Sequence, residues 1–306
     1  MLPNTIVLHL DFHKPLRTPK CKEQDSYYTV KVITHLFGIY CANDDKLHCF
    51  FYDDSIGGTG PNEVISLLDF LLGKLRTNLG PLDHLIVWCD NSPSQFKEQY
   101  LFFYLDYVVK RGDFLRADLK FMLEGHTYSY CDRRFGSVQS LLNRQEVVEV
   151  PQQWATIVRE SGLTNVKVYW VTLDMIKDYK TFLKLQYVAR NEDSENEKFA
   201  VSDIAWLNFG YGELANREGN LELVHHPDSV FLRFKMDAKQ CPKTVSYVKK
   251  KQAHELKPEL LKPVSRVSKP VKEDAKKGSS TLAEKYLTPN AERFYNSLRC
   301  IEKETE

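Results

Sequence analysis

The stretch Leu85-Ile86-Val87-Trp88-Cys89-Asp90 decides the fold class of this 306-residue chain. Five consecutive apolar residues are typical of a strand buried on both faces, and such strands occur mainly in parallel sheets that helices cover. Turn-forming residues follow at once, from Asn91 to Ser94. We therefore predict an α/β protein in which a central strand ends at a carboxylate.

Three strands and one helix are predicted before this stretch. Residues 5–12 alternate between apolar and polar side chains, which indicates a strand with one apolar face. Residues 26–42 and 47–53 are rich in β-branched and aromatic side chains and flank a turn, which predicts a hairpin. Apolar residues recur at helical spacing over 64–75, after the loop Gly57-Gly58-Thr59-Gly60.

A helix, a strand and a second helix are predicted after it, over residues 95–110, 119–123 and 132–147. The complete order is strand, strand, strand, helix, strand, helix, strand, helix. Two antiparallel pairings followed by right-handed crossovers would arrange these elements as a five-stranded mixed sheet flanked by helices. Residues 1–150 are predicted to form this core.

Residues 151–240 are predicted to form an α+β extension packed on the core. The expected helices cover 152–160 and 175–189, and the expected strands cover 166–172, 199–209 and 230–234. The acidic segment 191–197 between them is expected to be a loop.

Residues 241–306 are predicted to be a basic and largely disordered tail. Apolar periodicity fades there, and prolines and Gly278-Ser279-Ser280 appear, although one short helix is expected near 288–302. Residues 243–277 carry eleven Lys/Arg against four Asp/Glu, a net charge of +7, while the whole chain carries +1. Charge therefore separates a mildly acidic body from a basic tail.

Composition excludes several classes of protein. With 42% hydrophobic and 27% charged residues, the chain is not collagen-like, wholly disordered or a disulfide miniprotein. No apolar run approaches the roughly 20 residues of a membrane span, and the N-terminus has no features of a secretory signal, so no membrane partner is expected. The seven cysteines are scattered without a Cys-x-x-Cys pair, which argues against a zinc finger and favours free thiols.

Three acids are expected to meet in the core. Asp11 lies on the polar face of the first strand, Asp90 ends the fourth, and Asp132 begins the third helix. Because the first and fourth strands are expected to be central neighbours, the three carboxylates should cluster, and such a cluster is costly unless a cation neutralises it. Oxygen ligands suit Mg²⁺ or Mn²⁺, and these ions support phosphodiester cleavage and transfer.

Each acid also has an ordinary structural explanation. Asp11 is explained as a solvent-facing strand residue, Asp90 as the start of an Asx turn, and Asp132 as a helix N-cap. Glu63 is an accessory candidate, but a favourable interaction with the helix dipole explains it more simply. His126, in the loop Glu124-Gly125-His126-Thr127, is a second accessory candidate that would orient a water or a phosphate, and a hydrogen bond to the loop backbone explains it equally well.

Several short motifs occur in a fixed order. They are Leu8-His9-Leu10-Asp11-Phe12, Phe37-Gly38-Ile39-Tyr40, Gly57 to Glu63, Val87 to Ser92, Glu124 to Thr127 with Cys131-Asp132-Arg133, and Pro151-Gln152-Gln153-Trp154. Together they resemble a transposon-derived domain family of animal genomes, itself of unknown function, with an RNase H-like fold of the DDE transposase type. The resemblance covers roughly residues 5–235.

The resemblance implies that Asp11 and Asp90 are the first two acids of a site for Mg²⁺-dependent DNA cleavage and strand transfer. The third helix of the family carries an aspartate and, seven residues later, a glutamate on the same face. Here these positions are Asp132 and Gln139, and Arg134 stands where the family often has an acid. These departures imply a degenerate site, so enzymatic activity is left open at this stage. Gln139 is the third accessory candidate.

Nucleic acid is the expected partner, with Lys97 and the tail residues Lys249, Lys250 and Lys251 as its contacts through phosphate neutralisation. The lysine run also predicts a nuclear location, with the cytoplasm as the alternative. Two other functions are weighed. One is a domesticated module that binds nucleic acid or another partner without cutting. The other is a 3′–5′ exonuclease, which His13 disfavours because such enzymes place a glutamate at that position.

Overall fold

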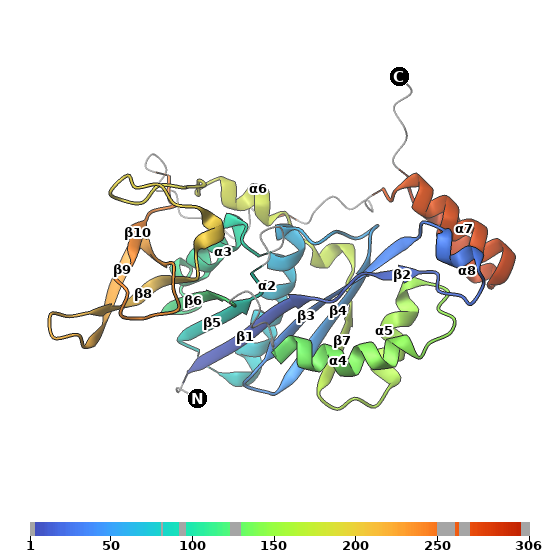
Figure 1. Ribbon diagram of the computed structural model, residues 1–306, viewed down its shortest axis with the longest axis horizontal. Coiled ribbons are helices and arrows are strands. Elements are labelled where there is room, and N and C mark those ends of the chain that lie inside the picture. Colours follow the sequence, from blue (N-terminus) through green and yellow to red (C-terminus); the bar gives the residue numbers. More distant parts are fainter. Residues whose placement is uncertain are drawn as a thin grey trace, which may run out of the picture.

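The computed structural model describes residues 4–80, 82–91, 96–122, 130–249, 261–262 and 270–300 (Figure 1). The strands are β1 (Thr5–Phe12), β2 (Leu16–Thr18), β3 (Val32–Cys41), β4 (Lys46–Asp53), β5 (His84–Cys89), β6 (Arg116–Phe121), β7 (Val166–Trp170), β8 (Trp206–Ala215), β9 (Leu221–Arg233) and β10 (Lys243–Val245). The α-helices are α1 (Asp25–Tyr28), α2 (Pro61–Leu79), α3 (Gln99–Lys110), α4 (Tyr130–Asn143), α5 (Pro151–Glu160), α6 (Tyr179–Lys184), α7 (Glu273–Tyr286) and α8 (Pro289–Ser297), with short 3₁₀ turns at Leu173–Met175 and Val201–Asp203. Within these described ranges, no helix is long and apolar enough to cross a bilayer.

One mixed sheet runs through the molecule, in the order β10-β9-β8-β6-β5-β1-β3-β4-β7, with β2 paired to β3. The predicted α/β class is confirmed, but the prediction of five strands is wrong, because the sheet has ten. Strand edges present unpaired N–H and C=O groups, and the chain after residue 150 pairs with both edges of the predicted core. β7 adds to β4 in parallel, and β8 adds to β6 in the antiparallel sense.

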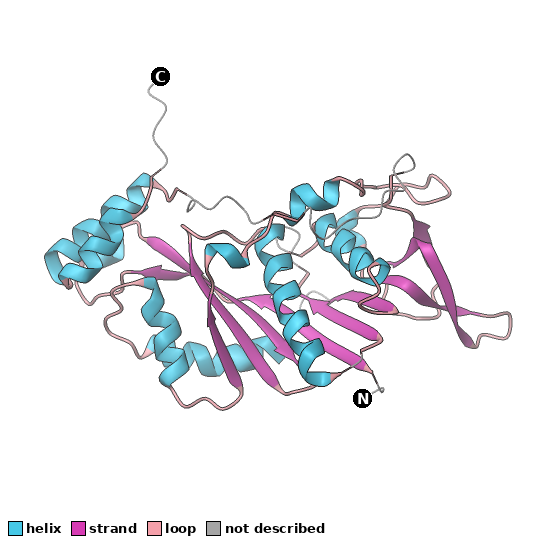
Figure 2. Ribbon diagram, turned by 180° about the vertical axis from the view of Figure 1, so that it is seen from behind, coloured by secondary structure: helices cyan, strands magenta, loops and turns pink. Residues whose placement is uncertain are grey.

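Helices α2, α3 and α6 cover one face of the sheet (Figure 2). α2 begins where Pro61 occupies the first turn after the extended Gly60. Its buried stripe includes Val64, Leu68 and Leu71, at the spacing of one helix face. These side chains pack on the inward residues of β1 and β5, so the even-numbered positions of β1 point into this larger core.

Helices α4 and α5 cover part of the opposite face, over β3 and β4 (Figure 1). Phe135, Val138 and Leu142 of α4 are buried together with Trp154 of α5. The indole Nε1 of Trp154 donates to Thr18 Oγ1 at 2.9 Å and so ties α5 to β2. This second face is the one toward which the odd-numbered residues of β1 point.

The C-terminal residues 270–300 form two packed helices, so the prediction of a disordered tail is wrong for this segment. The short helix expected near 288–302 is confirmed as α8. α7 and α8 pack at the outer end of β2 and β3, where Tyr295 is buried and its hydroxyl donates to Glu149 O at 2.6 Å. Ser279 is fully buried, accepts from Val32 N at 3.1 Å and donates to Thr18 O at 3.2 Å. The small residues that interrupt the apolar pattern of this segment therefore lie where α7 packs closely against the rest of the protein.

Replacing Gly278 by alanine is expected to destabilise the protein, whereas Gly136→Ala on α4 is expected to stabilise it. Alanine favours a helix over glycine by about 1 kcal/mol at both positions. A Cβ on Gly278 would collide with the Val30 carbonyl and with Thr29 Cγ2 at 2.5 Å, whereas a Cβ on Gly136 meets nothing within 4 Å. Overpacking costs about 1–3 kcal/mol. Urea unfolding should therefore give opposite signs for the two variants, and equal shifts would contradict the docking of α7.

Candidate functional site

Two of the predicted acids lie at neighbouring strand ends. β1 and β5 pair in parallel, with Leu10 opposite Cys89, so Asp11 and Asp90 follow side by side at the same edge. Both positions point to the face that carries α4, because their neighbours Leu10 and Cys89 are buried in the core on the other face. The predicted proximity of these two acids therefore follows from the observed register.

The third acid is brought in by the first turn of α4. The Cys131 thiol donates to His9 O at 2.9 Å, which fixes the start of α4 on β1. Further along the helix, Phe135 lies against Gly38, where a Cβ would approach Phe135 Cε1 to 2.8 Å. Gly38 is the register partner of Asp11 on β3. The missing side chain lets α4 lie close to the sheet, and this places Asp132 beside Asp11.

The three carboxylates influence one another. The pKa of Asp11 is raised to about 7, first by burial and then by the charge of Asp132, a side-chain hydrogen bond with Asp132 and the charge of Asp90, while the Phe12 N–H lowers it. Asp11 and Asp132 are thus in hydrogen-bonding contact, with Asp90 nearby. Asp90 Oδ1 accepts the Asn91 N–H at 2.7 Å. The principal contributions to the Asp11 shift include no cation.

Arg134 does not neutralise this cluster. Its guanidinium donates to Asp45 Oδ1 at 2.5 Å, and the Tyr40 hydroxyl donates to the same oxygen at 2.7 Å. Asp45 lies in the turn after Cys41, whereas Gly38, the register partner of Asp11, lies within β3. The arginine that stands where the family often has an acid is thus engaged with Asp45 and not with the three carboxylates.

The donor set fits a divalent cation only in part. Within the described residues, no group of three or more His, Cys, Asp or Glu side chains is arranged to hold a metal ion. Mg²⁺ keeps several waters, however, and commonly binds one or two carboxylates together with phosphates of a substrate. Asp11 and Asp132 supply two such carboxylates in contact, and Asp90 adds negative charge beside them.

The accessory candidates lie elsewhere. Gln139 hydrogen bonds with His13, and its Nε2 donates to Asn143 Oδ1 at 2.6 Å, so it serves the helix surface two turns beyond Asp132. Glu63 is buried and accepts the Gly58 N–H at 3.1 Å, which shapes the glycine loop before α2. It does not contribute to the shift at Asp11. His126 lies outside the described residues.

Two of the four predicted nucleic-acid contacts, Lys97 and Lys249, are among the described residues, and both ammonium groups donate to backbone carbonyls. Lys97 is only 6% exposed, its ammonium donates to Ser202 O, and it lies 4.9 Å from the centre of the Phe121 ring. A buried ammonium in these contacts cannot reach a phosphate, so this placement argues against Lys97 as a contact. Lys249 donates to Lys184 O at 2.6 Å. Lys250 and Lys251 lie outside the described residues, and the nuclear location stays a prediction.

The sequence reasoning missed an aromatic cluster beside the acids. The ring of His9 lies 6.1 Å from Trp88, to which it is parallel, and 5.2 Å from Tyr130, which in turn stacks on Tyr40 at 5.3 Å. Burial lowers the pKa of His9 to about 4, so the ring is neutral near pH 7. The alternation of residues 5–12 placed His9 and Asp11 on one face, but cross-strand partners were needed to reveal the cluster.

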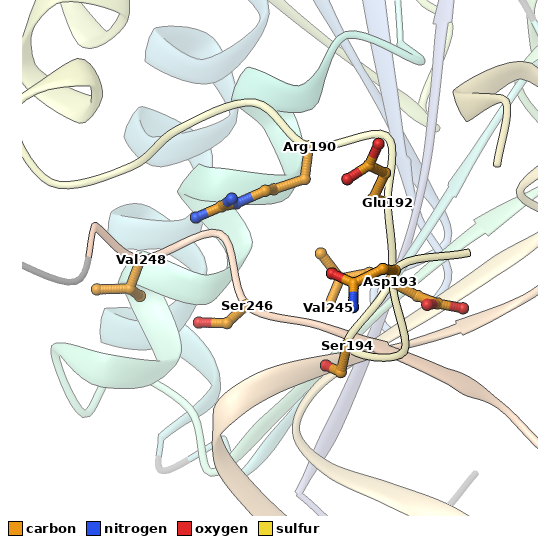
Figure 3. A pocket seen from close by; sticks show the side chains of 8 residues that line it. Arg190, Glu192, Asp193, Ser194, Val245, Ser246 and Val248 are labelled. Carbon is orange, nitrogen blue, oxygen red and sulfur yellow. The ribbon is translucent and has the colours of Figure 1, made fainter. Parts of the chain in front are cut away.

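A cavity of about 290 Å³ lies apart from these acids, between the loop 190–196 and the segment after β10 (Figure 3). Arg190 and Glu192 bring opposite charges to its wall. Asp193 is committed to the loop itself, because it accepts the N–H groups of Glu195 and Glu197 at 2.9 Å and pairs with Lys243 at 3.0 Å. The lining therefore offers no net charge complementarity to a ligand.

Comparison with known proteins identifies the family. Residues 24–204, more than half of the chain, match the family described as "Domain of unknown function (DUF7869)". The chain belongs to this family. The DUF7869 match runs from just before α1 to just after the 3₁₀ turn at Val201–Asp203, so it contains Asp90 and Asp132 but not Asp11. No curated protein matches the chain.

Proposed function

We propose that this DUF7869 protein is a transposase-derived, RNase H-like protein in which Asp11, Asp90 and Asp132 form a divalent-cation site for phosphodiester cleavage or strand transfer. The observation that carries the proposal is the convergence of three acids from β1, β5 and α4 on one face of the sheet. The central strand order β4-β3-β1-β5-β6, with α2 and α3 in the connections, is the order expected for an RNase H-like core and supports the same proposal.

The three acids have different roles in the proposed site. Asp11 and Asp132 would hold the cation between them, and Asp90 would complete the negative field. When bound, such a cation supplies Lewis-acid stabilisation of charge on a phosphodiester. Asp132 itself takes the role of the helix ligand, because Gln139 is engaged with His13 and Asn143. The loss of a carboxylate at position 139 therefore leaves the proposed site intact.

A non-catalytic role is the second candidate. It is favoured by the bond from Asn91 N–H to Asp90 and by the absence, among the described residues, of a complete three-ligand group. In this case the protein would bind nucleic acid or another partner without cutting it. Metal binding separates the two candidates, because the non-catalytic role does not need it.

Asp90→Asn is expected to abolish metal-dependent nicking of labelled DNA. The amide keeps the size of the side chain but removes its charge, and the loss should exceed the roughly 10–100-fold that removing an outer partner of a metal ligand costs. Mn²⁺ titration by calorimetry and a nicking assay with and without Mn²⁺ are the measurements. Asp228→Asn, at an exposed position on β9, is the matched control.

Wild-type protein that binds no Mn²⁺ and nicks no DNA, while it still binds DNA in a salt-dependent manner, would select the non-catalytic role. Nicking that survives equally in both variants would point to a contaminating nuclease. Either outcome would remove the proposed catalytic function from Asp90.

A further inference from the structure

A polar groove runs along the outer face of α4 and reaches the C-terminal end of α5. Its volume is about 550 Å³. The lining residues are Arg133, Gly136, Ser137, Ser140, Leu141, Arg144, Ser161 and Leu163. Positions 133, 136, 137 and 140 follow one another at helical spacing on α4, and Arg144 is the first residue after the helix, so they form one continuous wall. We call this the α4 groove.

The charge of the α4 groove is positive. Two arginines line it and no carboxylate does. Arg133 and Arg144 are both exposed, and neither makes an ion pair within the part of the chain that the structure describes. The guanidinium carbon of Arg133 lies 5.7 Å from the Tyr130 ring, which holds its stem along the helix. Unpaired guanidinium groups on one wall are suited to oxyanions such as phosphates.

The floor of the α4 groove is polar and consists of small residues. Ser137 and Ser140 are exposed and make no side-chain hydrogen bond in the described residues, so both hydroxyls are free to bind an oxygen. Gly136 lies between the arginines, and open space surrounds the position of its absent Cβ. Glycine inside a helix costs about 1 kcal/mol relative to alanine, and packing against the protein does not explain it here. Its absent side chain keeps the groove deep.

The groove is connected to the carboxylates through one helix. Asp132 and Arg133 are consecutive residues of the first turn of α4, and their Cα atoms are about 3.8 Å apart. From Arg133 to the end of α4 the helix rises about 15 Å, and Arg144 follows directly; this length corresponds to about four to five nucleotides along the axis of a stacked strand at 3.4 Å each. A strand that follows the groove would therefore leave it beside Asp11 and Asp132.

We propose that the α4 groove binds the sugar-phosphate backbone of a nucleic-acid strand and delivers it to the carboxylate cluster. The delivery of the strand to the carboxylates rests on the proposed function, but binding of the strand in the groove needs no metal. Arg133 and Arg144 contact phosphates, and Ser137 and Ser140 supply hydroxyl donors between them. The recognition is independent of sequence, because it uses the backbone only.

The double variant Arg133→Gln/Arg144→Gln is the principal test. Full-length protein is titrated onto a fluorescein-labelled 20-nucleotide strand in EDTA, by anisotropy, from 50 to 200 mM KCl. Two lost phosphate contacts to a single strand should reduce the slope of log K against log salt by about 1.4 and lower the affinity at 100 mM salt by about 25-fold. Arg217→Gln is the matched control, because Arg217 is exposed in the β8–β9 turn, at the end of the molecule away from α4 (Figure 1).

Gly136 gives a second test that keeps both arginines. Gly136→Glu places a carboxylate in the groove and should weaken DNA binding by a similar factor. Gly73→Glu makes the same change at an exposed position of α2, on the other face of the sheet, and should leave the affinity close to that of the wild type. Circular dichroism and thermal unfolding verify that the variants are folded.

The outcomes separate this inference from the proposed function. Variants in the groove that lose DNA affinity but still bind Mn²⁺ support the groove, even if no variant nicks DNA. A wild-type protein that does not bind the strand, or groove variants that bind as well as wild type, would overturn the groove and leave the result for Asp90→Asn untouched. Poly-glutamate that competes as well as the DNA strand would also overturn it, in favour of an acidic protein partner.

Discussion

Asp118→Ala is expected to lower the free energy of unfolding by about 3–5 kcal/mol, which is the cost of removing one member of a buried ion pair. Asp118 is 1% exposed on β6. It accepts hydrogen bonds from Asn208 Nδ2 at 2.7 Å, from His84 Nε2 at 3.0 Å and from Arg116 at 3.2 Å. The alanine would leave Asn208 and His84 without this acceptor and would leave Arg116 with Glu213 alone, at 3.7 Å.

The network behind Asp118 extends to a second buried charge. Arg233 is completely buried, donates to the Asn208 side chain and to the Glu213 carbonyl, and lies 4.8 Å from the Trp206 ring. Asn208 therefore joins the two charges by accepting from one and donating to the other. Because β6, β8 and β9 meet at these residues, the loss of Asp118 should loosen the sheet where the C-terminal strands join the core.

The pH dependence gives a further check on Asp118. Burial alone would raise its pKa, but the hydrogen bond from His84 and the charge of Arg116 outweigh burial, and the net shift is downward. A lowered pKa means that the carboxylate stabilises the fold above pH 4 and that this contribution is lost as the pH falls through the folded-state value. Urea unfolding at pH 7 and pH 3 measures it.

Two variants control the experiment. Asp118→Asn keeps one acceptor oxygen and should cost less than alanine, while Asp228→Ala, at an exposed position on β9, should change the free energy of unfolding by less than about 0.5 kcal/mol. A loss below about 1 kcal/mol for Asp118→Ala would mean that the three donors find other partners.

Short-range sequence patterns predicted the helices and strands whose formation depends mainly on neighbouring residues. β1 was predicted at its observed bounds, and β5 and α5 within one residue, because alternation, a continuous apolar run and Pro151 are short-range signals. The strand predicted over 26–42 was wrong at its start, where α1 and an extended segment precede β3. Aromatic residues such as Tyr27 and Tyr28 raised the strand signal, yet both are exposed. Composition alone does not distinguish a strand from a surface turn.

Pairing partners were the part that the sequence could not supply. The start of β8 was predicted seven residues too early and the start of β9 nine residues too late, and the first residues of β9 are mostly exposed, so they give no clear apolar pattern. The lack of information on pairing partners also explains why five strands were predicted where the sheet has ten. A hydrophobic pattern defines which face of a strand is buried but not which other strand it meets, so the joining of β7 and β8 to the core was not predicted.

At the candidate site, too, some features follow from short-range patterns, and others depend on residues that are distant in the chain. The meeting of Asp11, Asp90 and Asp132 was predictable because adjacent parallel strands bring their carboxyl ends to one edge. The pairing of Arg134 with Asp45 was not predictable, since the partner lies 89 positions away in the chain. The α4 groove was missed although its signal was present, in the helical spacing of Arg133, Ser137, Ser140 and Arg144.

Asp11→Asn is expected to stabilise the protein at pH 8 and to leave its stability nearly unchanged at pH 4. Burial and the two neighbouring acids raise the pKa of Asp11 from its ordinary value of 3.8 to about 7 in the folded protein. Between these values the folded protein retains a proton that the unfolded chain releases, so wild-type stability falls as the pH rises from about 4 to 7 and stays low above it. Asparagine removes this penalty, which is on the order of 2 kcal/mol after allowance for solvent screening.

A divalent cation should reverse the order of stability. If Mn²⁺ binds between Asp11 and Asp132, a concentration of 100 times its dissociation constant adds about 2.7 kcal/mol to the wild-type protein and nothing to Asp11→Asn. Urea unfolding at pH 8, with EDTA or with Mn²⁺, therefore compares the same two proteins in both states, with Asp228→Asn as the control for nonspecific binding. Asp11→Asn more stable in both conditions would show that the repulsion exists for some reason other than a metal. Equal stability at pH 8 in EDTA would show that the carboxylates do not repel, and the physical basis of the site would be lost.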